Sequence, residues 1–225
     1  MAKTRKTTDE VAGEDRDASI YDRMLKDIST GQLAGGQRLK VAELAKHYGV
    51  STSPIREVLR RMQGEGFVEF SPNRGATVRK ADAAAVQNVF EMLQLLEPYF
   101  VTWFAEFARP EWIGEMDEIQ KEIAVIGTSD LAHFRRLDAA FHETICKYHY
   151  NQPAADMWRN LRRALNVYGA RLRVTPPRYA QILQEHEQLL QAFCDNDVER
   201  AEQVLRQHID GSYVQMSQQM KAIGF

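Results

Sequence analysis

Residues 49–78 read GVSTSPIREVLRRMQGEGFVEFSPNRGATV, and they set the architecture of the N-terminal part of the chain. Ser53 is a favourable N-cap, and Pro54 fits the first position of a helix. The pattern therefore predicts a helix over residues 53–63, which Gly64 brings to an end.

The elements around this helix complete a helix-turn-helix with a hairpin behind it. A helix over 20–33 and a short helix over 41–48 come first, and a three-residue turn follows the short one. Two strands, 67–71 and 76–79, are expected on either side of the turn sequence Pro-Asn-Arg-Gly.

The helix over 53–63 has one apolar face and one polar face. At helical spacing, four apolar residues fall on the first face: Ile55, Val58, Leu59 and Met62. Ser53, Arg56 and Arg60 fall on the other, where they could reach base edges in a major groove. The alternative interpretation is a charged face turned to water, but the basic hairpin that follows favours DNA binding.

Further groups at the two ends of this region suit phosphate contacts. Ser51 and Thr52 join Ser53 at the N-terminus of the helix, where free N–H groups and hydroxyls attract anions. At the hairpin tip, Asn73, Arg74 and Gly75 suit a phosphate or a minor groove. The expected partner is therefore double-stranded DNA.

From residue 82 onward only helical signals appear. Each break between helices carries a proline, a glycine or a capping residue. Six helices are predicted, over 82–107, 110–126, 129–149, 152–174, 177–194 and 197–219. The expected fold class is mainly α: the helix-turn-helix with its hairpin over 19–80, then an all-α bundle over 81–225.

The composition fits a cytoplasmic protein of 225 residues. Residues 1–18 are polar and predict a disordered tail with no secretion signal. Cys146 and Cys194 are isolated, as in a reducing compartment, and no apolar run is long enough to cross a membrane. Basic residues outnumber acidic ones by 11 to 6 over 19–80, whereas acidic residues prevail by 20 to 14 over 81–225. Such asymmetry suggests two domains with different partners.

Four ionisable residues occupy positions in or beside the apolar stripes of the C-terminal helices. They are Asp138, His142, His186 and His208. Burying them without partners would be costly, and convergence on one divalent cation (Zn²⁺, Ni²⁺ or Mn²⁺) would explain all four. The alternatives are hydrogen-bonded core histidines and a simple Asp138–His142 pair along one helix. We expect His133 and His149 at the surface, and Glu143, Glu185 and Glu187 to point away from the metal face.

The sequence also resembles a known family. The run from Glu43 to Val78 resembles the winged helix-turn-helix of the GntR family of bacterial regulators, in which the positions of Ser53, Arg56 and Gly75 lie at the DNA. The C-terminal part resembles the FadR-type ligand domain, or FCD domain, in its six-helix variant. The segments that carry this likeness are L137-D138-A139-A140-F141-H142, E185-H186 and H208.

The resemblance implies a metal at the Asp and three His positions, and a small organic acid that binds the metal. Leu93 stands where many members carry an arginine that faces the ligand. Other arginines could replace it: Arg135, Arg162, Arg171 or Arg173.

The function expected from sequence is a ligand-responsive transcription repressor and not an enzyme. We expect a homodimer that binds a pseudo-palindromic operator, because one such domain covers only a few base pairs. A purely structural metal is the first alternative. A metalloenzyme joined to a DNA-binding domain is the second, but no general base or nucleophile is evident beside the four residues.

Overall fold

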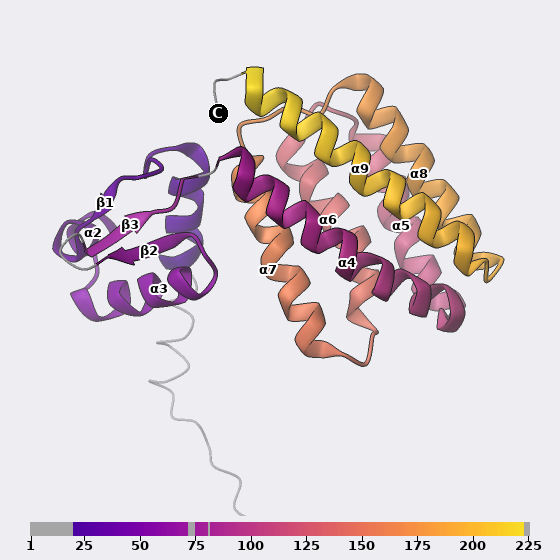
Figure 1. The fold of residues 1–225 in the computed structure, drawn as a ribbon, viewed down its shortest axis with the longest axis horizontal. Helices are drawn as coiled ribbons and strands as arrows, with labels where there is room; N and C mark the ends of the chain where they lie inside the picture. Colours follow the sequence, from indigo (N-terminus) through magenta and orange to yellow (C-terminus); the bar gives the residue numbers. More distant parts are fainter. Residues whose placement is uncertain (1–19, 72–74, 81, 223–225) are drawn as a thin grey trace, which may run out of the picture. The chain divides into compact units, whose positions relative to one another are not determined.

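The computed structural model describes residues 20–71, 75–80 and 82–222, and Figure 1 shows its fold. The chain divides into two compact units, Met1–Ala81 and Asp82–Phe225. The mainly helical fold class, with an N-terminal helix-turn-helix and a C-terminal helical domain, is confirmed. The tail expected over 1–18 and the hairpin residues Asn73 and Arg74 lie outside the described residues.

The N-terminal unit contains a helix over 20–30, then β1 (Arg38–Leu39), α2 (Val41–Tyr48), α3 (Thr52–Gly64), β2 (Val68–Ser71) and β3 (Gly75–Val78). Gly49 ends α2 in the left-handed region at φ 71°, which glycine adopts without steric cost. The four apolar residues of α3 are all buried. They fix the rotation of the helix about its axis, so its polar residues face outward.

The start of α3 differs from the prediction. Ser51, not Ser53, is the N-cap, and the helix begins at Thr52. Pro54 is therefore its third residue, where the missing N–H costs nothing because the first four N–H groups of a helix have no partner inside it. Ser53 and Arg56 are consequently the second and fifth residues of a helix that is longer than expected.

The sheet has three antiparallel strands in the order β1-β3-β2. β2 and β3 form the predicted hairpin, with Phe70 opposite Ala76. The prediction missed β1, because two residues are too few to show the alternation that marks a strand. Its Leu39 is buried and pairs with Ala76, so β1 connects the hairpin to the helices before it.

The C-terminal unit consists of six long helices among its described residues. They are α4 (Ala83–Phe107), α5 (Pro110–Ile126), α6 (Leu131–Lys147), α7 (Gln152–Tyr168), α8 (Pro176–Cys194) and α9 (Val198–Ala222). In Figure 1, α4 and α9 lie side by side, and α8 packs against α9. Side-chain caps fix several helix starts: Asp82 accepts from the N–H of Ala85, and Thr175 from that of Arg178.

α7 ends six residues before the predicted boundary of 174. Gly169 follows it, and residues 169–175 form a non-helical segment. The guanidinium of Arg135, on α6, donates to the carbonyls of Ala170 and Leu172. These bonds satisfy backbone acceptors that a longer helix would have used internally.

The core of this unit is apolar and continuous. Phe100 and Phe104 of α4, Phe141 of α6 and Phe193 of α8 are almost fully buried in it. Within the described residues, no helix combines the length and apolar character needed to cross a membrane.

Candidate functional site

The outer face of α3 carries the residues expected to contact DNA. Ser51, Thr52, Ser53, Arg56 and Arg60 are all exposed. Their neighbour Arg61 is engaged within the domain, because its Nε lies 3.1 Å from Glu65 Oε1 and its guanidinium stacks on the ring of Tyr21. Arg56 and Arg60 have no hydrogen bond or ion pair with another described side chain, so their guanidinium groups are available to a partner.

Three residues are predicted to contact DNA from the wing: Asn73, Arg74 and Gly75. Of these, Gly75 is the one that the structure describes. It is the first residue of β3 and adopts φ 71°, in the left-handed region that favours glycine. A Cβ atom added at Gly75 would meet no atom of the described residues within 4 Å, so the space beside its Cα is open.

The structure brings the four candidate metal ligands together. Asp138, His142, His186 and His208 each offer one ligand atom, and these atoms all lie within 4.8 Å of one another. His142 Nε2 lies 3.1 Å from His208 Nε2, and His186 Nε2 lies 3.7 Å from Asp138 Oδ1. The three histidines are buried, and Asp138 is partly exposed.

His186 and His208 each make a hydrogen bond through Nδ1, and this bond orients the ring so that Nε2 faces the cluster. His186 Nδ1 donates to Gln120 Oε1 at 2.9 Å, while the Gln120 amide nitrogen donates to the carbonyl of Leu183. His208 Nδ1 donates to Glu185 Oε2 at 2.8 Å. In each ring Nδ1 is therefore the donor of an outward hydrogen bond, and Nε2 is the nitrogen turned toward the cluster.

The donor set fits a divalent cation. His186 Nε2 is buried without a hydrogen-bond partner among the described residues, although it faces the cluster. Burial, together with nearby positive groups such as Arg162, holds the pKa of His142 and of His186 well below the usual range. Both imidazoles are thus neutral near pH 7, which is the form that binds metal.

Glu185 is a residue of the site that the sequence interpretation did not identify. It lies outside the cluster of four, as expected, but its carboxylate contacts the far ring nitrogen of His208. Burial alone would raise the pKa of Glu185, but hydrogen bonds from His208 and Arg178 outweigh it, and the pKa lies below its usual value. Helical spacing could not reveal this contact, because it joins α8 to a residue of α9.

A cavity of about 130 Å³ adjoins the cluster. Asp138 lines it, and so do three of the four arginines that could replace the one absent at position 93: Arg135, Arg162 and Arg173. The fourth, Arg171, is exposed and is not among the lining residues. Leu93 itself is buried in the core.

Arg162 is the lining arginine best prepared to bind an anion. Its Nε lies 2.9 Å from Glu97 Oε1, and the same oxygen accepts from Trp158 Nε1. Arg162 Nη2 is buried and has no hydrogen-bond partner among the described residues. By contrast, the guanidinium of Arg135 already donates to two carbonyls of the 169–175 segment.

His149 corrects another expectation. It was predicted at the surface, but only 1% of it is exposed. Its ring packs against Tyr99, Phe100, Trp103 and Tyr150. His149 is buried because, just after the C-cap of α6, its ring packs against aromatic side chains of α4. The periodicity of α6 alone does not show this contact.

Comparison with known proteins assigns both parts of the chain. The family described as "Bacterial regulatory proteins, gntR family" matches residues 17–78, and the FCD domain matches residues 88–211. The chain is 26% identical to the HTH-type transcriptional regulator YdhC of Bacillus subtilis, over 85% of this chain and 86% of YdhC. It is 25% identical to the HTH-type transcriptional repressor RspR of Escherichia coli, over 84% of each protein.

The fold also occurs among solved structures. The structure of McbR/YncC from E. coli superimposes with a TM-score of 0.75 at 19% sequence identity, covering 90% of this chain and 97% of the other.

Proposed function

Because the chain belongs to the gntR family of bacterial regulatory proteins that carry an FCD domain, we propose that it represses transcription in response to a small organic acid. Like the other members of its family, it is a DNA-binding transcriptional regulator and not an enzyme. In the proposed division of labour, residues 19–80 bind DNA and residues 81–225 bind the effector and form the dimer. The site of action would be the cytoplasm.

The exposed face of α3 supports the DNA-binding role of individual residues. Arg56 and Arg60 would contact bases or phosphates in the major groove, with Ser51, Thr52 and Ser53 at phosphates near the helix start. Asn73, Arg74 and Gly75 would contact the DNA from the wing.

The proposed cofactor is one divalent metal ion, Zn²⁺, Ni²⁺ or Mn²⁺. Asp138, His142, His186 and His208 would hold it, since they supply one carboxylate and three imidazoles within a small volume. When bound, the metal would act as a Lewis acid toward a carboxylate ligand.

One observation carries the sensing proposal: Asp138 belongs both to the cluster and to the lining of the 130 Å³ cavity. A ligand in that cavity would lie next to the metal at one end. The guanidinium of Arg162 belongs to the same cavity lining. An acid with a second oxygen-bearing group could use both. Arg135 and Arg173 would shape the remaining wall.

A homodimer is proposed because α4 leaves apolar side chains exposed along one face. Met92, Leu95, Tyr99 and Phe107 recur at helical spacing and are 37%, 70%, 38% and 52% exposed. Tyr99 hydroxyl lies 2.9 Å from that of Tyr150, which is also exposed, so the apolar surface continues beyond α4. A surface of this kind on a two-fold axis suits a second copy of the chain and a pseudo-palindromic operator.

Metal analysis combined with operator titration tests the proposal. The protein is purified without chelator, and its metal content is measured in the wild type, in His186→Ala and in the control His133→Ala, whose histidine lies outside the cluster. We expect about one metal per chain in the wild type and the control, and a large loss in His186→Ala. Wild-type protein that neither contains nor takes up metal would refute the site.

Candidate organic acids are then added during titration of the operator with metal-loaded protein. An acid that changes operator affinity supports sensing through the metal, with an expected coupling of about 1–3 kcal/mol. If metal is present but no acid changes the affinity, the metal is structural.

A further inference from the structure

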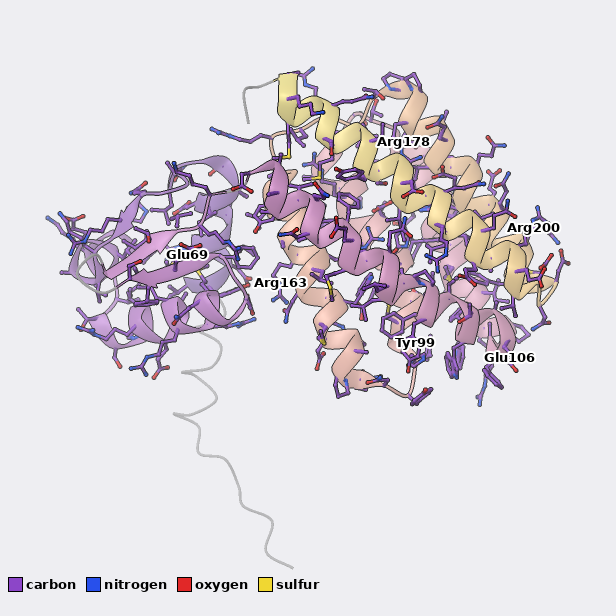
Figure 2. All side chains as sticks on the ribbon, viewed as in Figure 1. Glu69, Tyr99, Glu106, Arg163, Arg178 and Arg200 are labelled. Atoms are coloured by element: carbon purple, nitrogen blue, oxygen red, sulfur yellow. The ribbon has the colours of Figure 1, made fainter. Side chains whose placement is uncertain are left out.

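Arg178 is a buried cation whose partners connect two helices. It is only 4% exposed and lies between α8 and α9, where Figure 2 labels it. Its Nη1 donates to Glu185 Oε1 at 2.8 Å. Its Nη2 donates to the backbone carbonyl of His208 at 2.8 Å and to Ser212 Oγ at 3.0 Å. Arg178 belongs neither to the cluster of four candidate ligands nor to the lining of the cavity.

The Glu185 carboxylate divides its two oxygens between Arg178 and His208. Arg178 and Glu185 are seven residues apart on α8, so they lie on one face, two turns apart. One oxygen accepts from the guanidinium and the other from His208 Nδ1. The carboxylate therefore holds the imidazole of His208 at Nδ1. The arginine holds the same residue at its backbone carbonyl.

The backbone of α9 is adapted to this arginine. A Cβ atom added at Gly211 would lie 2.5 Å from Arg178 Nη1, which is closer than non-bonded atoms can approach. Glycine is less favourable than alanine inside a helix, and here it leaves room for the guanidinium. The fit between Gly211 and Arg178 indicates a fixed position for the charge.

We propose that Arg178 and Glu185 are positioning residues for the metal ligand His208. They hold its ring so that Nε2 faces the other three ligands. The inference rests on the proposed metal site. Arg178 also connects that site to the cavity, because it donates a hydrogen bond to Ser212, which is part of the cavity lining.

The chemistry of such a pair is general. A carboxylate that accepts from the far nitrogen of a metal-binding imidazole fixes the tautomer and makes the ring a better donor. The arginine holds that carboxylate in place through a charge-assisted hydrogen bond.

The test measures Ni²⁺ binding by calorimetry in the full-length, metal-free protein. Glu185→Gln removes the charge of the carboxylate, and Glu187→Gln is the matched control, because Glu187 is exposed on the same helix. We expect Glu185→Gln to bind Ni²⁺ about 10- to 100-fold more weakly than wild type and Glu187→Gln to bind like wild type. Equal affinities of the two variants would overturn the inference.

Two further measurements separate positioning from folding. The visible absorption of bound Co²⁺ reports ligand geometry, so its bands should change in Glu185→Gln and stay unchanged in Glu187→Gln. Gly211→Ala, which displaces Arg178 while keeping every charge, should also weaken Ni²⁺ binding. If Glu185→Gln fails to fold, Gly211→Ala becomes the deciding variant. Wild-type Ni²⁺ affinity in Gly211→Ala would then refute the role of Arg178.

The proposed function and this inference fail in different ways. Wild-type protein that binds neither Ni²⁺ nor Co²⁺ contradicts the metal site itself. Wild-type binding that survives in both Glu185→Gln and Gly211→Ala contradicts only the positioning role.

Discussion

His142 Nε2 and His208 Nε2 lie 3.1 Å apart, although 66 residues separate the two histidines in the chain. The hydrogen bond from His208 Nδ1 to Glu185 occupies the other ring nitrogen, so Nε2 is the atom that faces His142. Two imidazole nitrogens this close either share a proton or bind one cation. The contact joins α6 to α9, so a cation there would connect helices that are distant in sequence.

Metal addition should therefore stabilise the folded protein. At a free metal concentration about 100 times the dissociation constant, the free energy of unfolding should rise by about 2.7 kcal/mol. Thermal unfolding of chelator-treated protein, with and without Ni²⁺, measures this. The increase should vanish in His142→Ala. An unfolding temperature of the wild type that does not change when metal is added would contradict the prediction.

Arg56→Ala should weaken operator binding by about 1–3 kcal/mol, because the exposed guanidinium is lost from the face of α3. Fluorescence titration of an operator duplex at fixed salt measures the change. Arg61→Ala is the control, since Arg61 pairs with Glu65 inside the domain. If both variants bind like wild type, α3 does not read the operator through this face.

Arg162→Lys should weaken binding of the organic acid by about tenfold or more, while metal content stays unchanged. Lysine keeps the charge beside Glu97 but loses the planar fork that pairs with a carboxylate. Calorimetry with the metal-loaded protein gives the affinity, and Arg171→Lys, at an exposed position, is the matched control. Equal affinities in the two variants would remove Arg162 from the binding site.

His149 should make the protein less stable in acid. Its Nδ1 accepts from the backbone N–H of Asn151 at 3.0 Å, and its Nε2 is buried without a hydrogen-bond partner among the described residues. Burial lowers the pKa of this imidazole below the ordinary value of 6.5. As the pH falls below about 6.5, the unfolded chain binds a proton that the folded chain does not, so stability is lost.

Replacing His149 with phenylalanine should reduce this loss. The slope of unfolding free energy against pH should be smaller in His149→Phe than in wild type, by up to about 1.4 kcal/mol per pH unit. Urea unfolding at several pH values below 6.5 measures both slopes. Tyr99 and Tyr150, the titratable groups against the ring, carry no charge in acid. Parallel slopes would show that His149 is protonated equally in both states.

Leu95→Glu should weaken the dimer about tenfold or more, because a buried unpaired carboxylate is costly at an interface. Analytical ultracentrifugation over a concentration series gives the dissociation constant. Val125→Glu is the control, since Val125 is 89% exposed on α5 and lies outside the apolar stripe of α4. An unchanged association in Leu95→Glu would place the interface elsewhere.

Much of the fold and of the candidate site could be predicted from the sequence, because both follow helical periodicity. His186 interrupts an apolar stripe, and the spacing of Asp138 and His142 places them one turn apart. Such signals lie within one helix. The contacts that complete the site, Glu185 to His208 and Gln120 to His186, join different helices, and no local pattern encodes which helices become neighbours.

Two of the errors have the same origin. The end of α7 at Tyr168 depends on Arg135 binding the carbonyls of the following segment, and the burial of His149 depends on aromatic residues of α4. In each case a residue from another helix overrides the local preference. The N-cap of α3 is different: Ser51 and Ser53 are equally suitable residue types, so sequence alone could not choose between them.

The segment over 169–175 gives this architecture a route for divergence. Leu172, Arg173 and Val174 line the cavity, yet they belong to no helix, and side-chain amides from α9 hold the carbonyl of Arg173. The three clustered histidines lie on helices whose register is fixed by a packed core. Substitutions or length changes in this segment would therefore reshape the cavity without disturbing the histidines, so under the proposed function a descendant of this regulator could respond to a new effector while its metal ligands stayed the same.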